Sequence, residues 1–325
     1  MVNDITLQND WHVVARSQDL ETGKILTVRL LGEDLVLWRS GDQALAWEDR
    51  CPHRGASFAQ GWVKDNNLFC PYHGFAFNDS GECVHVPAHP NQPPSKLSRG
   101  CVKTFHTQER YGMIWVCLGT PQRDLPPLPE WEDTSYRRFF FGPVRYQASG
   151  LRAVENFFDF SHIPYVHGGS LTKAERAVMD GDYKVEVHSE GINVSEVNVW
   201  QFDIETKQET SVIADYWIFR PLTVCLRSSG SDNHRMAVFF TVTPVDEEES
   251  IAWRWIFLNH AHQVPETEIN ELANVIIYQD VAIVESQRPR RLPLNLESEF
   301  HVASDRSSVI YRKWLKQLGV SFGAV

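Results

Sequence analysis

Short apolar segments separated by turn residues run through the first third of the chain. They lie at 25–31, 35–39, 44–47 and 111–119. Gly, Asp and Ser separate the first three of these segments, and segments of this length that are rich in Val, Ile, Leu and Trp are typical of strands. The pattern predicts a small antiparallel β domain that ends at about residue 125, within a Pro-rich linker at 121–131.

The remainder of the chain combines strand patterns with one long helical pattern. The strand patterns lie at 139–148, 183–202, 211–227 and 235–259. Between 265 and 288, apolar residues recur at the i, i+3, i+4, i+7 spacing that places them on one face of a helix. These residues are Ile269, Leu272, Ala273, Ile276, Ile277, Ile283 and Val284. We therefore predict an α+β fold with domains at 1–125 and 126–325, the second being an antiparallel sheet packed by helices.

The composition is that of an ordinary globular protein. Of the 325 residues, 42% are hydrophobic and 22% are charged, and the net charge of −11 argues against nucleic acid or an anionic membrane as a partner. We expect no transmembrane helix, because no stretch approaches 18 consecutive apolar residues, and no signal peptide at the N-terminus. Four of the six cysteines are scattered, which favours a reduced, cytoplasmic protein over a disulfide framework.

Two Cys and two His form mixed pairs on either side of residue 60. Cys51 and His53 form one pair, and Cys70 and His73 form the other. A Rieske [2Fe–2S] cluster needs this set of ligands, with two thiolates on one iron and two imidazoles on the other. Pro after each Cys and Gly after each pair predict two tight turns that hold one cluster between them. The alternatives are unrelated side chains or a structural zinc site, although zinc sites more often pair Cys with Cys and His with His.

A second candidate metal site lies at 155–167. His162 and His167 would diverge by about 140° on a straight helix. Pro164 breaks the helix after His162 and can bring His167 back towards it. Two His and one carboxylate on one side of Fe(II) leave the other positions open for O₂ and substrate. The alternative is a polar capping network among core histidines.

Asp280 is the predicted third iron ligand. It lies at the centre of the apolar stripe of the 265–288 helix, where an unpaired carboxylate is costly and must be neutral, paired or on a metal. Glu285 lies about 140° away around the same helix, so we expect it to be solvated or ion-paired. Asp159 precedes His162 by three residues, so its carboxylate can hydrogen-bond that ligand.

These motifs together resemble those of the Rieske non-haem iron oxygenases. The cluster signature is matched by Cys-Pro-His-Arg-Gly at 51–55 and Cys-Pro-Tyr-His-Gly at 70–74. The motif of the catalytic iron is matched at Asn156, Asp159, His162 and His167. The family also takes its third ligand from an acidic residue on a late helix, which agrees with the choice of Asp280.

The resemblance covers essentially the whole chain and is closest to the phthalate oxygenase and vanillate O-demethylase branch. Two weaker features, at 108–112 and 301–306, are similar to the hydroxylases of saxitoxin tailoring. This branch implies a monooxygenase that acts on a small cyclic or alkaloid-like substrate. It would hydroxylate one C–H position or remove one methyl group. The branch also implies that 1–125 is a Rieske domain and that 126–325 is the catalytic domain.

The resemblance further implies how the enzyme receives electrons. A separate flavin- or ferredoxin-type reductase would deliver them from NAD(P)H to the cluster, which passes them to the Fe(II) that activates O₂. Asn156 and Asp159 would be catalytic residues, and Asp159 would contact His73 of a neighbouring subunit. That contact requires a closed homo-oligomer, most simply a trimer. The rival interpretation is a non-catalytic Rieske electron carrier or redox scaffold, which would have no use for the second metal site.

Overall fold

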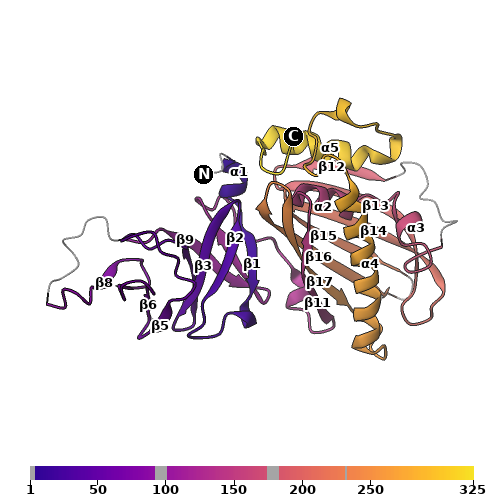
Figure 1. Cartoon of the computed structure of the whole chain (residues 1–325). Coiled ribbons are helices and arrows are strands. Elements are labelled where there is room, and N and C mark those ends of the chain that lie inside the picture. The colour runs from indigo at the N-terminus through magenta and orange to yellow at the C-terminus, as the bar shows by residue number, and fades with distance from the viewer. Residues whose placement is uncertain (1–3, 92–100, 174–182, 231–232) are drawn as a thin grey trace. The chain divides into compact units, whose positions relative to one another are not determined.

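The computed structural model describes residues 4–91, 101–173, 183–230 and 233–325 (Figure 1). The chain consists of two compact units, Met1–Asp124 and Leu125–Val325. Both units contain antiparallel sheets, and long helices occur in the second, so the predicted α+β class is confirmed. Among the described residues, no helix is both long and apolar enough to cross a membrane.

The first unit contains a six-stranded antiparallel sheet and a smaller four-stranded one. The order in the larger sheet is β1-β10-β9-β4-β3-β2 and in the smaller β5-β6-β7-β8. The larger sheet contains β1 (His12–Arg16), β2 (Leu26–Leu30), β3 (Glu33–Ser40), β4 (Gln43–Glu48), β9 (Thr104–Arg110) and β10 (Met113–Cys117). The smaller contains β5 (Trp62–Lys64), β6 (Asn67–Phe69), β7 (Ala76–Phe77) and β8 (Cys83–His85), and the helices are α1 (Ile5–Gln8) and η1 (Ser17–Asp19).

The predicted strands of this unit are confirmed, and their apolar residues form its core. Trp38 and Trp47, from β3 and β4, meet edge to face with ring centroids 4.9 Å apart. Phe58 and Phe77 join the same buried cluster, which therefore links the larger sheet to the smaller one. Large aromatic side chains of this kind dominate the burial energy of a small core.

The second unit is built on a seven-stranded antiparallel sheet in the order β11-β17-β16-β15-β14-β13-β12. Its strands are β11 (Arg137–Tyr146), β12 (Lys184–His188), β13 (Gly191–Phe202), β14 (Glu209–Arg220), β15 (Thr223–Ser229), β16 (Arg235–Asp246) and β17 (Glu249–Leu258). The predicted ranges 183–202, 211–227 and 235–259 each contain two strands joined by a tight turn. At one such turn Gly191 has φ +148°, and a Cβ there would meet Ile218 O at 2.1 Å, so only glycine fits.

The helical segments of this unit are η3 (Pro129–Trp131), α2 (Gly150–Phe157), α3 (Ile163–Val166), α4 (Glu266–Ser286), η5 (Leu296–Ser298), η6 (Ala303–Asp305) and α5 (Arg306–Leu318). Of these, α2, α4 and α5 contact the sheet. Figure 1 shows α4 running along the face of the sheet, and it contacts both β11 and α2. The long helix predicted at 265–288 is thus confirmed, whereas the pattern analysis did not predict α5.

The apolar stripe of α4 differs from the prediction on one side. Ile269, Ala273, Ile277 and Val284 are buried together with Asp280, as expected. Ile283, however, is 42% exposed, because it lies at the edge of the stripe and the helix rotates that edge away from the sheet. Leu272 and Ile276, on the same side of the helix, are half-buried. Ile276 lines both cavities described below, and Leu272 lines the second of them.

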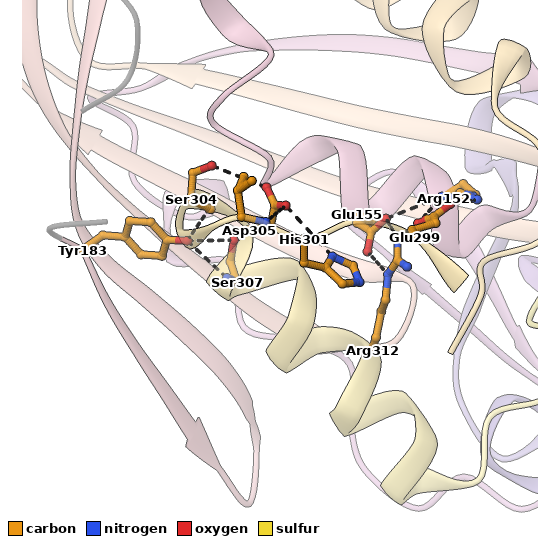
Figure 2. Close-up of polar contacts among 10 residues, drawn as sticks. Arg152, Glu155, Tyr183, Glu299, His301, Ser304, Asp305, Ser307 and Arg312 are labelled. Atoms are coloured by element: carbon orange, nitrogen blue, oxygen red, sulfur yellow. Dashed lines mark hydrogen bonds and ion pairs between the residues drawn. The ribbon is translucent and has the colours of Figure 1, made fainter. Parts of the chain in front are cut away.

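A buried network of charges ties α2 to the C-terminal segment (Figure 2). Arg312 on α5 donates two hydrogen bonds to Glu155 on α2, from Nε at 2.6 Å and Nη2 at 2.7 Å. Arg152 and Arg312 both also pair with Glu299, at 2.7 and 2.6 Å. Since Arg152, Glu155 and Arg312 are each less than a tenth exposed, the network fixes the helix that leads into the second candidate metal site.

The 301–306 segment has a structural role in this region. Tyr183 donates a hydrogen bond to the carbonyl oxygen of Ser304 at 2.8 Å, and Asp305 accepts one from the backbone N–H of Val302 (Figure 2). The Asp305 bond closes η6, the short helical turn directly before α5, and the Tyr183 bond ties that turn to the residue before β12.

Candidate metal centres

The two loops that carry the first metal motif have the same backbone hydrogen bonds. In one, Cys51 N–H donates to Ala56 O and Gly55 N–H donates to Cys51 O. In the other, Cys70 N–H donates to Phe75 O and Gly74 N–H donates to Cys70 O. Both glycines have positive φ, +73° and +69°, which confirms the two tight turns expected from the sequence.

The four candidate cluster ligands lie together at the tips of these loops. Cys51 and Cys70 are buried and lie side by side, and burial, followed by the neighbouring Cys70 thiol, raises the pKa of Cys51 to about 11. His53 and His73 are exposed, with ring centroids 4.6 Å apart. His53 also stacks on Phe75 at 4.5 Å. Two adjacent thiols on the inner side and two adjacent imidazoles on the outer side fit a [2Fe–2S] cluster with one iron bound to each kind of ligand.

The two histidines of the second motif are positioned by the short helix α3. His162 is its N-cap residue and His167 its C-cap residue, so one helical turn separates them. Pro164 lies in the first turn of α3, where a missing N–H is tolerated. The prediction that Pro164 ends a helix after His162 is therefore wrong: α2 has already ended at Phe157, and Pro164 helps to begin a new helix.

His162, His167 and Asp280 come together in space. Their Nε2 and Oδ1 atoms form a triangle with sides of 3.2, 3.3 and 3.0 Å. Ligand atoms about 2.1 Å from one octahedral cation and about 90° apart would be separated by about 3.0 Å. Within the described part of the chain, Asp280 Oδ1 is buried and has no hydrogen-bond partner, despite its distance to both imidazoles. The triangle therefore fits a shared cation better than it fits hydrogen bonds.

Electrostatic effects at this site favour bound positive charge. Burial raises the pKa of Asp280, but the adjacent imidazoles of His162 and His167 outweigh it and bring the pKa to about 2. Burial likewise lowers the pKa of His162, while Asp159 and Asp280 raise it to about 9. The carboxylate thus stays ionised at neutral pH, as a metal ligand must.

A neighbouring side chain contacts one of the histidine ligands, but it is not Asp159, which was predicted to hydrogen-bond His162. Oδ2 of Asp159 lies 3.8 Å from Nδ1 of His162, beyond hydrogen-bond distance, and Oδ1 instead accepts from the backbone of Ser161. Gln279 Oε1 lies 2.9 Å from Nδ1 of His167. The sequence did not reveal Gln279, because its side chain leaves α4 about 100° away from Asp280 and belongs to no periodic pattern.

Glu285 also differs from its prediction. It is half-buried, and Oε1 accepts a hydrogen bond from the backbone N–H of Gln147 at 2.7 Å. Its carboxylate therefore provides a hydrogen-bond acceptor for the backbone just after β11, and it does not form the predicted ion pair with any described residue.

The triangle opens into a cavity of the second unit. Its empty volume, including the open mouth, is about 870 Å³, within the usual range for small-ligand sites. Asn156 and Phe157 line it from α2, Ile276 from α4, and Arg254 and Ile256 from β17. Trp255, by contrast, packs against Trp131 and Phe140, so only part of β17 faces the cavity.

A second cavity shares part of this lining, including Leu171, Met236 and Ile276. His234 and His260 lie in it, close to Asp203, and their rings stack 4.4 Å apart at 6°. No pattern in the sequence predicted this group, because its members lie on separate segments of the chain.

Comparisons with known proteins match both halves of the chain to known domain families. The Rieske [2Fe-2S] domain family matches residues 10–106, and the Vanillate O-demethylase oxygenase C-terminal domain family matches residues 146–321. The chain is 30% identical to methylxanthine N1-demethylase NdmA of Pseudomonas putida, over 96% of this chain and 89% of that protein. It is 28% identical to methylxanthine N3-demethylase NdmB of the same organism, over 97% and 90%. A shorter match, 39% identical over 35% of this chain, is to the oxidoreductase NdmD of Pseudomonas putida.

Solved structures share the fold of this chain. The Pseudomonas putida CBB5 NdmA structure superposes with a TM-score of 0.82 at 28% identity, covering 96% of this chain and 90% of that one. Dicamba monooxygenase superposes with a TM-score of 0.80 at 23% identity, which shows the shared fold.

The chain belongs to the Rieske-type non-haem iron oxygenases. Its C-terminal domain is that of the vanillate O-demethylase branch. It is therefore an oxidoreductase that uses O₂, with a Rieske [2Fe–2S] cluster and a mononuclear iron as cofactors, and the predicted resemblance is confirmed. The zinc and electron-carrier alternatives are excluded by the two matches together.

Proposed function

We propose that this oxygenase demethylates, or hydroxylates at a single C–H position, a small cyclic compound. The observation that carries the proposal is the triangle of His162, His167 and Asp280 at the edge of a largely apolar cavity. The similarity to two methylxanthine demethylases over almost the whole chain supports demethylation in particular. Electrons would come from a separate NAD(P)H-dependent reductase of the flavin or ferredoxin type, as the match to an oxidoreductase suggests.

In this proposal each metal group has a defined set of ligands. Cys51, His53, Cys70 and His73 hold the cluster, whose role is single-electron transfer. His162, His167 and Asp280 hold the iron, which when bound activates O₂ beside the substrate. The protein's own contribution is geometric. Gln279 accepts the Nδ1–H of His167 and so keeps the Nε2 lone pair directed at the metal.

The cavity lining has two further tasks. Phe157 and Ile276 exclude water from the face where substrate binds. Asn156 presents an amide to the same space, where it can orient a polar group of the substrate.

We also propose that electron transfer occurs between subunits. Asp159 is 39% exposed at its side chain, and His73 is exposed at its loop tip, so both are accessible to a partner chain. A bridge from Asp159 to His73 of the next subunit would connect each cluster to a neighbouring iron in a closed ring, most simply a trimer.

The proposed activity can be tested with the purified holoprotein, NADH and a phthalate-type reductase. Methylated purines and methoxylated aromatic rings would be supplied with O₂, and mass spectrometry would detect loss of a methyl group with formaldehyde, or gain of one oxygen atom. Products that form equally well with His162→Ala would overturn the proposal, since the triangle would then not be the site of reaction.

A further inference from the structure

A second group of possible metal ligands lies in the second cavity, at one end of the seven-stranded sheet. Its members are Asp203, His234 and His260, and one ligand atom from each lies within 4.8 Å of the others. Oδ2 of Asp203 is 3.8 Å from Nδ1 of His234, which is too long for a hydrogen bond. The rings of His234 and His260 are parallel, with centres 4.4 Å apart.

The three residues come from turns that a flat sheet would keep apart. Asp203 directly follows β13, His234 directly precedes β16, and His260 lies just after β17. Because β14 and β15 lie between β13 and β16, the ends of these two strands would be about 14 Å apart at the usual strand spacing. The 3.8 Å contact therefore means that the two turns reach over the ends of β14 and β15.

The carboxylate of Asp203 is held so that one oxygen faces the histidines. Its Oδ1 accepts hydrogen bonds from the backbone N–H groups of Glu205 and Thr206, at 3.1 and 2.8 Å. It also accepts one from the hydroxyl group of Thr206 at 3.0 Å. These bonds fix the carboxylate and leave Oδ2 on the side of His234. Hydrogen bonds of this kind orient the ligands of metal sites.

The ring of His260 is oriented in a similar way. Its Nδ1 lies 3.4 Å from Oδ1 of Asn259. The Asn259 amide is itself fixed, because it accepts from the backbone N–H of Arg235 at 2.7 Å and donates to the carbonyl oxygen of Asn233 at 3.1 Å. A proton on Nδ1 leaves the lone pair on Nε2, which is the tautomer that can bind a metal through Nε2.

We propose that Asp203, His234 and His260 bind a divalent cation of the Zn²⁺ type. Zinc accepts two imidazoles and one carboxylate, and water takes the fourth position of such a site. Ligand atoms about 2.1 Å from a tetrahedral ion are about 3.4 Å apart, so the 3.8 Å contact has to shorten by about 0.4 Å. The ion would join the turns after β13, before β16 and after β17, and so fasten this end of the cavity. The site shares no residue with the iron triangle, and the inference does not depend on the proposed reaction.

The zinc and iron contents of one sample provide the test. The iron-loaded holoprotein would be dialysed against about 10 µM Zn²⁺, and both metals would be measured by mass spectrometry. We expect about one zinc per chain, with no loss of iron. His234→Gln and His260→Gln should each lower the affinity for zinc at least about 100-fold, because loss of a ligand costs more than loss of one of its supporting partners. Zinc should also raise the unfolding temperature of the wild type but not of these variants.

The matched control is His262→Gln. His262 lies two residues beyond His260, but it is exposed, and its Nε2 lies 3.2 Å from the backbone oxygen of Asn259. This variant should bind zinc as the wild type does. Should a histidine variant fail to fold, Asp203→Asn takes its place: it keeps an oxygen for the bonds to Glu205 and Thr206, and it should also weaken zinc binding.

Three results would overturn the inference. The first is the absence of bound zinc at this concentration. The second is zinc that displaces iron in equal amount, which would place the zinc in the iron triangle. The third is zinc retained by the His234 and His260 variants, which would place it on other side chains. None of these measurements requires turnover, so failure of the proposed reaction would leave this test unchanged.

Discussion

Gln279 and His167 are joined by a 2.9 Å contact between Oε1 and Nδ1, so two successive residues of α4 act on the iron triangle. Asp280 reaches it directly, and Gln279 acts through the imidazole. Because such partners fix the ring orientation of a metal ligand, Gln279→Ala should lower iron affinity or turnover by about 10- to 100-fold. The cluster spectrum should not change. Iron content and product formation measure the effect, and Tyr278→Ala, an exposed neighbour, is the control.

Substitution of the proposed iron ligands should have a different effect from substitution of Glu285, an acid on the same helix as Asp280. His162→Ala, His167→Ala and Asp280→Ala should each lose mononuclear iron and turnover but keep the visible spectrum of the cluster, which lies in the other unit. Glu285→Ala should retain iron, since its carboxylate is bound to the backbone of Gln147. Iron loss in Glu285→Ala together with retention in Asp280→Ala would mean that the wrong carboxylate was chosen.

The buried pairing of Glu155 with Arg312 should contribute strongly to the stability of the second unit. Arg312→Met leaves Glu155 without its main partner at a site where Glu155 is 8% exposed. Removal of one member of a buried pair costs about 3–5 kcal/mol, and we expect a loss of that size in the free energy of unfolding. Chemical denaturation of the Arg312→Met and Arg312→Met/Glu155→Gln variants checks this. The double variant should be the more stable of the two.

The first unit contains a pairing that should make its stability depend on pH. Arg39 donates two hydrogen bonds to Glu109, and this pairing holds the pKa of Glu109 below its usual value. A lowered carboxyl pKa gives stability that is present above the unfolded-state pKa and is lost as the pH falls through the folded-state pKa. Because both side chains are partly exposed, the effect should be about 1 kcal/mol. Unfolding midpoints measured between pH 7 and about pH 3 should therefore fall less steeply for Glu109→Gln than for the wild type.

Electron transfer between subunits predicts complementation in mixed oligomers. His162→Ala subunits should lack iron and His73→Ala subunits should have a damaged cluster, so each alone should be inactive. Co-expressed, an intact cluster on one chain would face an intact iron on its neighbour, and activity should return. Sedimentation must first establish that mixed oligomers form. Activity that stays absent in assembled mixtures would show that electrons remain within one chain.

In the same assembly, Asp159→Asn should keep both metals and the fold but lose most activity. The amide would remove the negative charge that the proposed bridge places between His162, whose Nδ1 is 3.8 Å from Oδ2 of Asp159, and His73 of the next subunit. Iron content, the cluster spectrum and turnover measured on one preparation distinguish this result from simple loss of a metal.

The candidate sites were predictable where chemistry and local spacing coincide. Cys51, His53, Cys70 and His73 occur as two compact pairs, and each pair is recognisable from its neighbours alone. Asp280 was found because a carboxylate at the centre of an apolar stripe conflicts with its surroundings, and only a partner resolves the conflict. Both kinds of signal lie in residues that are close together in the sequence.

The features that were missed depend on contacts between separate segments. Gln279 and His234 gain their importance from His167 and from Asp203, which lie on other segments of the chain. The interpretation of Pro164 was wrong because the same residue can end one helix or begin the next, and the choice depends on where α2 stops. Ile283 fits the helical period, yet it lies at the edge of the apolar stripe, and its exposure depends on how α4 packs against the sheet. The α+β class itself was predictable, because periodicities of two and of 3.6 residues are properties of each segment.

The positions of the three proposed iron ligands along the chain have a consequence for the stability of the second unit. His162 and His167 flank a single helical turn, whereas Asp280 lies on a helix more than a hundred residues further along the chain. An ion held by all three would act as a crosslink that closes a long loop, and closing a loop in this way restricts the unfolded chain far more than the folded one. Loading with iron should thus fasten α4 to α3, so that resistance to heat and to proteases would itself report how much of a preparation is loaded.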